Sequence, residues 1–192
     1  MVLTNEPYVP GRRTAPRVYA ARASTGERIV RVAASVPDGL ASQLLALDDD
    51  AITNTLATSA THGPCYVFPD AIAPSDAVAI TPTSWHVARD TYPWLAEEVA
   101  HCQPCFAIVV AGAAVSLSFT ARLTEHAAEV GVDTLVAHRG RGYAAAVTLA
   151  WATAIRASGR VPLYSTNDDN TSSQAVARRC SLIEYARETS WT

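Results

Sequence analysis

The sequence predicts an α/β protein, and three observations lead to this prediction. From residue 106 onward, apolar segments follow the order strand, strand, strand, helix, strand, helix, strand. A loop rich in glycine and arginine, residues 138–144, stands between a predicted strand and a predicted helix. The chain has 192 residues, of which 49% are hydrophobic and 17% charged, and this fits one globular domain.

The first half of the chain carries the weaker structural signals. Three prolines within residues 1–16 predict a loose lead-in, and frequent Pro, Thr and Ser between Pro69 and Pro82 predict loops. The acidic run Asp48-Asp49-Asp50 is typical of a solvated turn or a helix cap. The elements expected in this half are strands at 18–23, 29–34 and 65–68 and helices at 37–47 and 93–101.

The second half has clearer patterns. One helix is expected to start near Gly142, with apolar residues at helical spacing, and to stop at Gly159. Another is expected from a cap at Asn170 or Thr171 to about Cys180. The predicted strands are 106–110, 114–121, 129–135, 161–166 and 182–186, and the first two form a hairpin.

The composition excludes several kinds of chemistry. All 15 basic residues are arginine, so the chain cannot supply the lysine of a Walker-type phosphate loop or of a Schiff base. The net charge of −3 argues against a nucleic-acid or membrane partner. The start of the chain lacks a signal-peptide pattern, and the longest apolar stretch, 105–115, is too short to cross a bilayer. A cytoplasmic location is therefore expected.

The cysteines invite a metal-site interpretation that the spacing does not support. His101-Cys102-Gln103-Pro104-Cys105 contains a CxxC, but a structural zinc site needs four ligands and the sequence has no second CxxC or HxxxH. We therefore expect four free thiols and no metal.

The glycine- and arginine-rich loop carries the strongest functional signal. Glycines let a backbone approach a ligand closely, and the amides at a helix start favour an anion. Arg139 and Arg141 can add charge-assisted bonds, so the loop predicts a phosphate or pyrophosphate site. A plain turn is one alternative. Another is a dinucleotide fold, because Gly140-x-Gly142-x-x-Ala145 matches its fingerprint, but strand 161–166 has no acidic residue for the ribose.

The same segment resembles a known superfamily. An apolar strand precedes Arg139-Gly140-Arg141-Gly142-Tyr143-Ala144, which matches R/Q-x-x-G-x-G/A; the strand 162–166, Asn170-x-x-Ser173 and the stretch 177–182 follow. Over residues 104–186 the chain is similar to the Gcn5-related N-acetyltransferases (GNAT). The resemblance implies an α/β fold with a central mixed sheet and a splay between two parallel strands, 129–135 and 161–166. It also implies one domain over 1–192, with residues 1–103 on the acceptor side and 104–192 forming the acetyl-CoA-binding core.

The resemblance further implies which residues bind acetyl-CoA as co-substrate, without a metal. The pantetheine would contact the backbone of the first splayed strand, and the pyrophosphate would lie on the loop amides. Two residues of the last helix would face the cofactor. The residues in this order are Val132, Asp133 and Thr134; Arg139, Gly140, Arg141, Gly142, Tyr143 and Ala144; and Asn170 and Ser173.

The implied activity is direct transfer of an acetyl group to a primary amine, on a small molecule or a peptide, in a ternary complex; a homodimer is left open. Glu129 is the first candidate for the base that takes the proton, followed by His126 and Asp133. The usual acid is a tyrosine at the position that Ala177 holds here, so Tyr164, Tyr185 or water must replace it. We take Tyr164 as the acid. The alternative is a catalytically weak CoA-binding or regulatory module of the same fold.

Overall fold

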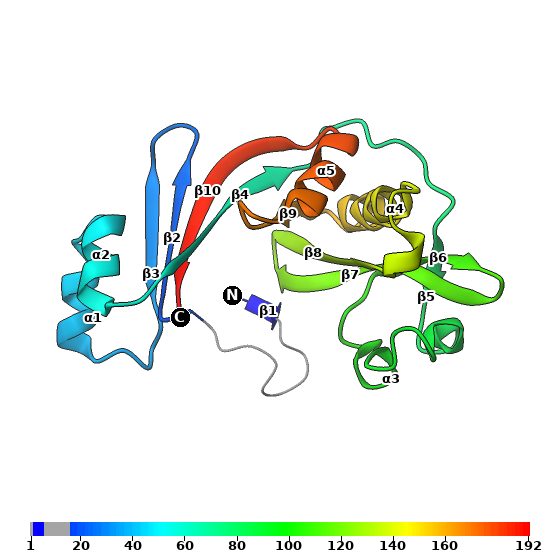
Figure 1. The fold of residues 1–192 in the computed structure, drawn as a ribbon, viewed down its shortest axis with the longest axis horizontal. Helices are drawn as coiled ribbons and strands as arrows, with labels where there is room; N and C mark the ends of the chain where they lie inside the picture. The colour runs from blue at the N-terminus through cyan, green and yellow to red at the C-terminus, as the bar shows by residue number, and fades with distance from the viewer. Residues whose placement is uncertain (1, 6–15) are drawn as a thin grey trace.

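In the described part of the chain, ten strands form one mixed sheet that runs through both halves (Figure 1). The structure is a computed structural model that describes residues 2–5 and 16–192. The strand order is β3-β2-β10-β4-β9-β8-β7-β6-β5, and β1 pairs with β7. Among the described strands, all neighbours are antiparallel except β8 and β9, which are parallel. The strands are β1 (Val2–Asn5), β2 (Val18–Ala23), β3 (Arg28–Val32), β4 (Ala60–Val67), β5 (Val78–Ile80), β6 (Cys105–Val110), β7 (Ala113–Thr124), β8 (Ala127–Thr134), β9 (Val161–Ser165) and β10 (Ile183–Trp191).

The helices lie at the ends of the sheet and on its two faces. The α-helices are α1 (Asp38–Leu45), α2 (Asp49–Leu56), α3 (Leu95–Glu98), α4 (Tyr143–Ala157) and α5 (Thr171–Arg179). Short 3₁₀ turns span Trp85–Ala88 and Val136–His138. Figure 1 shows α4 and α5 on one side of the central strands, α3 on the other, and α1 and α2 beside β3 at the far end.

The predicted order of elements in the second half is confirmed, with small shifts at the boundaries. The first half needed more correction. Residues 2–5 of the expected lead-in form β1, while residues 1 and 6–15 lie outside the described part of the chain. The acidic run is a helix cap, because the Asp48 carboxylate accepts the backbone N–H of Ala51 at 2.8 Å and α2 follows. β5 lies where loops were expected.

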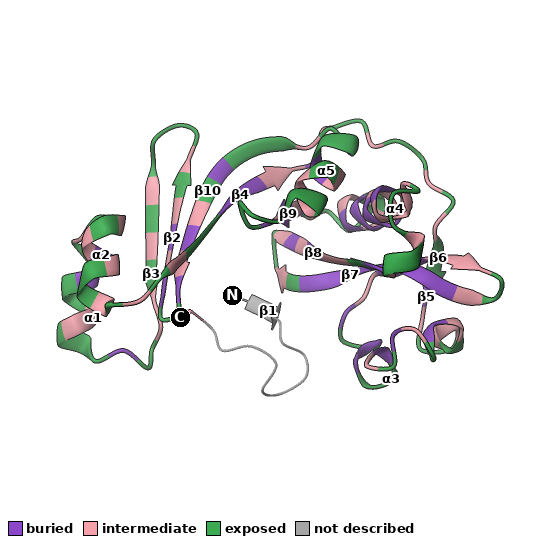
Figure 2. Cartoon of the chain, viewed as in Figure 1, coloured by how far each residue is buried: buried purple, intermediate pink, exposed green. Residues whose placement is uncertain are grey.

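Three clusters of buried side chains hold the helices to the sheet. α4 presents Val147, Trp151 and Ile155, spaced four residues apart, to the sheet, and Figure 2 shows the buried part of this helix. The Trp151 indole donates to the Thr120 hydroxyl at 3.0 Å, which satisfies its buried N–H. α3 and the segment before it pack around Leu95 on the opposite face. The third cluster lies under α1 and α2 and includes Val18, Leu44, Ile52 and Trp191.

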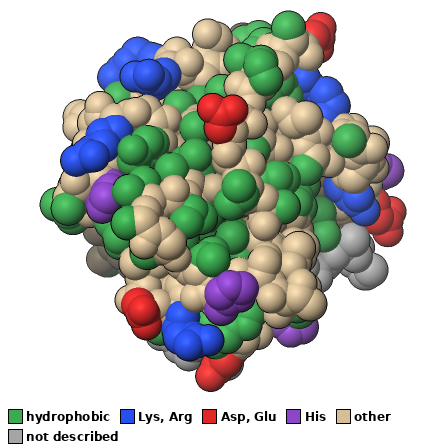
Figure 3. Space-filling model, turned by 90° about the vertical axis from the view of Figure 1, so that its right-hand side faces the viewer, with side chains coloured by type: hydrophobic (Ala, Val, Ile, Leu, Met, Phe, Trp, Pro, Cys, Tyr) green, Lys and Arg blue, Asp and Glu red, His purple; other side chains and the backbone are tan. Residues whose placement is uncertain are grey.

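Figure 3 views the end of the molecule where β5 and the β6–β7 hairpin lie. Apolar side chains gather in the middle of this face, and most charged ones lie nearer its outline. Val78 of β5 is among the exposed large apolar residues. No described helix is long and apolar enough to cross a membrane.

Candidate functional site

The two parallel strands separate after three residue pairs. β8 and β9 pair from Ala127↔Val161 to Glu129↔Leu163, although β8 continues to Thr134 and β9 to Ser165. Beyond this point β8 stays paired with β7, and β9 stays paired with β4. One edge of β8 therefore opens away from β9, which is the splay expected between these segments.

The alternation of peptide groups decides which residues of β8 face the opening. The Leu135 amide donates to the Val115 carbonyl at 3.0 Å, and the Asp133 carbonyl accepts from Ser116 and Tyr92, each at 3.3 Å. Peptide groups of successive strand residues point to opposite sides, so those of Val132 and Thr134 point toward β9. Of the three predicted backbone contacts, Val132 and Thr134 are suitably oriented. The backbone of Asp133 turns toward β7.

The loop after β8 has the backbone geometry that its glycines predict. Gly140 and Gly142 adopt φ of +74° and +84°, in the left-handed region that disfavours side chains. Gly142 is the N-cap of α4, and within the described chain no side chain caps this helix start. The first amides of α4 are thus left for solvent or an anion. Arg139 Nε donates to the Thr134 carbonyl at 3.1 Å and ties the loop to the end of the splayed strand.

Helix α5 uses both of its predicted cofactor residues for internal contacts. The Asn170 side chain accepts the Ser173 amide at 3.0 Å, so Asn170 is the helix cap. Gln174 does not complete a capping box with Thr171; its amide donates to the carbonyls of residues 167 and 168. The Ser173 hydroxyl lies 2.5 Å from the Tyr164 hydroxyl. Contact of Asn170 and Ser173 with a cofactor remains a prediction.

Tyr164 and Glu129 lie on opposite faces of the sheet. Tyr164 is 4% exposed, packs among the residues under α4 and α5, and has a pKa raised to about 12 by burial. Its neighbour Ser165 points to the other face and donates to the Glu129 carboxylate at 2.7 Å. The structure therefore does not bring the predicted acid and the predicted base together.

Glu129 stands at the last residue pair before the splay. Arg122 Nη1 donates to both of its carboxylate oxygens, at 2.9 and 2.8 Å. Opposite Glu129, β7 is irregular, because its register with β8 shifts between Thr120 and Arg122. Of the other base candidates, His126 is exposed at the turn before β8, far from the loop, and Asp133 is exposed near the end of β8.

Four residues to which the sequence analysis gave no role in the site continue from Glu129 across the same face. Ser165 pairs with Cys65 of β4, and the Tyr19 hydroxyl of β2 donates to Glu188 of β10 at 2.9 Å. We call Glu129, Ser165, Cys65, Glu188 and Tyr19 the polar row; it crosses five neighbouring strands.

The polar row is electrostatically coupled. Burial raises the pKa of Glu188; the Tyr19 hydrogen bond opposes this shift, and the charge of Glu129 adds to it. The pKa of Cys65 is also raised, first by burial and then by Glu188. Tyr185, an alternative acid, lies near the row. Burial is the main cause that raises its pKa to about 12, and the nearby charges of Glu129 and Glu188 add to this shift. Only the pairing of distant strands reveals this row.

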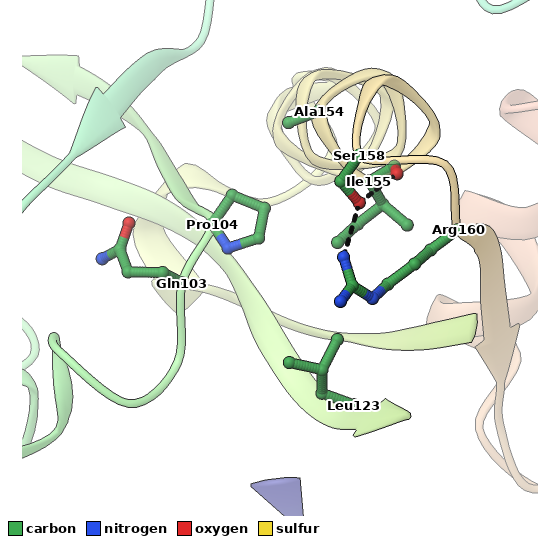
Figure 4. A pocket seen from close by; sticks show the side chains of 7 residues that line it. All are labelled: Gln103, Pro104, Leu123, Ala154, Ile155, Ser158 and Arg160. Carbon is green, nitrogen blue, oxygen red and sulfur yellow. Dashed lines mark hydrogen bonds between the residues drawn. The ribbon is translucent and has the colours of Figure 1, made fainter. Parts of the chain in front are cut away.

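A shallow pocket of about 350 Å³ lies elsewhere (Figure 4). It is lined by Gln103, Pro104, Leu123, Ala154, Ile155, Ser158 and Arg160, and Arg160 Nη1 donates to Ser158 at 3.1 Å. These residues surround the C-terminal end of α4, a helix of 15 residues whose start is therefore about 20 Å away. The pocket is thus separate from the loop.

All four cysteines are buried free thiols, as expected. Cys102 and Cys105 lie in the cluster under α3, and among the described residues no three His, Cys, Asp or Glu side chains gather as metal ligands.

No protein-family model and no curated protein matches the sequence. Solved structures do match the fold. The chain has the fold of the Gcn5-related N-acetyltransferases. Similar structures are a GNAT-family protein from Novosphingobium aromaticivorans (18% identity, 69% of this chain and 64% of that chain, TM-score 0.53) and a GNAT-family acetyltransferase from Colwellia psychrerythraea (14%, 75% and 61%, 0.55). A third is a GCN5-related N-acetyltransferase-like protein from Streptococcus suis (14% identity, 93% of this chain and 85% of that chain, TM-score 0.54).

The chain spans less than two thirds of the length of the first two of these GNAT structures. The splay and the loop lie in a GNAT fold, so the expectation about fold class is confirmed. At identities this low, the similarity to these structures shows the fold alone, so the activity has to be argued from the site.

Proposed function

We propose that the chain is an acetyltransferase that uses acetyl-CoA and transfers the acetyl group to a primary amine in a ternary complex. The observation that carries the proposal is the end of β8–β9 pairing after Glu129, with the loop of Gly140 and Gly142 following the same strand. An open strand edge offers unpaired peptide groups to an amide-containing arm, and a helix start offers amides to a pyrophosphate. The two features are adjacent in the chain, because the open edge belongs to β8 and the loop follows the end of this strand.

The reaction needs a proton acceptor. The amine nitrogen attacks the thioester carbonyl carbon, so a C–N bond forms and the C–S bond breaks. An alkyl ammonium has a pKa near that of lysine, about 10.4, and must lose a proton before it can attack. A further proton leaves the nitrogen after attack, and one returns to the CoA thiolate. Glu129 is the carboxylate at the last β8–β9 residue pair, where the open edge begins.

The polar row supports an amine acceptor. It carries two carboxylates, Glu129 and Glu188, on the face opposite α4 and α5. Arg122 and Ser165 both donate to Glu129 and fix the position of its carboxylate beside the splay, which suits it to orient the amine and to accept its proton. Burial raises the pKa of Glu188, so this second carboxylate also suits proton uptake. Tyr164 faces away from the row, and we assign protonation of the thiolate to Tyr185 or water rather than to Tyr164.

The alternative, a CoA-binding module with weak or no catalysis, has one observation in its favour. Ala177, at the position where the family usually has its acid, is buried in the core under α5 and offers no proton.

One experiment separates the two functions. The full chain is incubated with acetyl-CoA and a panel of primary amines, and free thiol is monitored beside thermal stabilisation by CoA. Amine-dependent thiol release is the expected result. Stabilisation by CoA without thiol release across the panel would favour the module. Stabilisation by NADPH but not by CoA would contradict both and favour the dinucleotide alternative.

A further inference from the structure

Arg179 of α5 lies directly over the glycine that starts α4. A Cβ built on Gly142 would lie 2.9 Å from Arg179 Nη2, 3.0 Å from its Cζ and 3.3 Å from its Nε. The guanidinium therefore rests against the Gly142 backbone at the mouth of the loop. Cys180, the next residue, donates to the Ala145 carbonyl of α4 at 3.8 Å, so the end of α5 is anchored to the first turn of α4.

Among the described residues, no carboxylate forms an ion pair with this guanidinium. The four ion pairs among the described residues use Arg28, Arg122 and Arg187, and none uses an arginine of this site. Arg139 and Arg141 donate to backbone carbonyls at 3.1 and 3.5 Å, and neither forms an ion pair within the described part of the chain. Arg179 thus lies against the N-terminus of α4, where the helix dipole is itself positive, and two further arginines belong to the loop that leads into this helix.

This arrangement is unfavourable without an anion and favourable with a polyanion. Like charges gathered at the positive end of a helix repel one another, whereas a pyrophosphate would be attracted by all of them and by the open amides. The exposed position of Arg179 leaves its donors free to turn toward a ligand on the loop.

We propose that Arg179 is a ligand for the pyrophosphate of CoA, acting from α5 across Gly142. The inference rests on the proposed function, because it names a further residue of the same cofactor site. It also gives Gly142 a second reason to be glycine. Any side chain at this position would occupy the place of the guanidinium as well as strain the backbone at φ +84°.

The test uses three ligands with decreasing numbers of phosphate groups. Affinities of the full chain and of Arg179→Gln are measured by calorimetry for CoA, for dephospho-CoA, which lacks the 3′-phosphate, and for pantetheine, which lacks the pyrophosphate together with the adenosine. We expect Arg179→Gln to weaken CoA and dephospho-CoA alike, by about tenfold or more, and to leave pantetheine unchanged. Arg178→Gln is the matched control on the same helix and is expected to change each affinity by less than about twofold.

Each other outcome has a definite meaning. Equal affinities of Arg179→Gln and the unmodified chain for all three ligands would overturn the inference. Loss of affinity for CoA alone would assign Arg179 to the 3′-phosphate and overturn it as well. An unmodified chain that binds none of the three would instead contradict the proposed function. Thermal unfolding without ligand checks that both variants fold, and partial recovery of dephospho-CoA affinity in Arg179→Lys would indicate that charge supplies part of the effect.

Discussion

Substitution of Gly131 by alanine tests the packing that holds the splayed strand. Gly131 lies in β8 opposite Phe119 of β7, and a Cβ built there would lie 2.4, 2.5 and 3.0 Å from three carbons of the Phe119 ring. Carbon atoms in contact normally stand 3.5–4.0 Å apart, so the ring must move by roughly 1 Å. Phe119 is 9% exposed and meets Trp94 edge to face at 5.1 Å between centroids, which leaves little room for that movement.

The expected loss of stability follows from two opposing terms. Overpacking of this kind costs about 1–3 kcal/mol, while removing glycine's freedom in the unfolded chain returns about 0.5–1 kcal/mol. Gly131→Ala should therefore lower the free energy of unfolding by about 1–2 kcal/mol, which corresponds to a fall in Tm of roughly 2–8 °C for a chain of this size. Urea unfolding followed by tryptophan fluorescence measures the change.

Two further variants make the prediction specific. Gly39→Ala in α1, where a Cβ would meet nothing within 4 Å, should instead stabilise the chain by up to about 1 kcal/mol. Phe119→Leu should relieve part of the cost in the Gly131→Ala background, so the two changes should not be additive. A Gly131→Ala variant as stable as the unmodified chain, or strict additivity of the pair, would refute the steric argument.

The remaining predictions concern charge and catalysis. Glu129→Gln should lower amine-dependent thiol release by about 10²–10⁴-fold while CoA still raises the Tm; an unchanged rate would remove Glu129 from the reaction. Burial raises the pKa of Glu188 above its unfolded value, so its contribution to stability falls as pH rises from about 4 toward the folded pKa. Glu188→Gln should therefore be more stable than the unmodified chain at pH 7 but not at pH 4, as thermal unfolding at both pH values can check. Gly142→Ala should cost about 1–2 kcal/mol in urea unfolding because its φ is +84°, and CoA binding should weaken with it. Prolonged incubation with acetyl-CoA should add at most about one acetyl group by intact mass, because the chain has no lysine; several additions would indicate that hydroxyl or thiol groups are modified.

The sequence predicted the strand, the loop and the helix around residues 129–157 well because their determinants are local. A strand, a turn and a helix are predicted within some 30 residues, by the glycines at 140 and 142 and by the apolar spacing through Val147 and Trp151. β10 was expected to end at Ala186 but runs to Trp191. The second part of β10 alternates between buried and more exposed residues, many of them polar, so its sequence alone predicts a strand only weakly.

The polar row and the position of β4 could not be predicted, because both depend on the pairing of distant strands. Gly63-Pro64 marks a turn by composition, yet both residues lie inside β4. Gly63 is required there because a Cβ would lie 1.7 Å from the Thr166 carbonyl oxygen. Tyr19 and Glu188 are 169 residues apart in the chain and meet only when β2 pairs with β10. The opposite orientations of Tyr164 and Glu129 likewise follow from register, which no local pattern states.

The place of β4 in the sheet has a consequence for how the chain can fold. β4 lies between β9 and β10, strands that follow it by about a hundred residues, and it pairs with both. During synthesis it has no partner until nearly the whole chain has left the ribosome, and contacts of such long sequence separation form slowly. A fragment beginning at residue 104 would lack β4 and leave an edge of β9 and both edges of β10 bare, which favours aggregation. Residues 104–192 are therefore not an independent folding unit, and the proposed activity must be studied in the full chain.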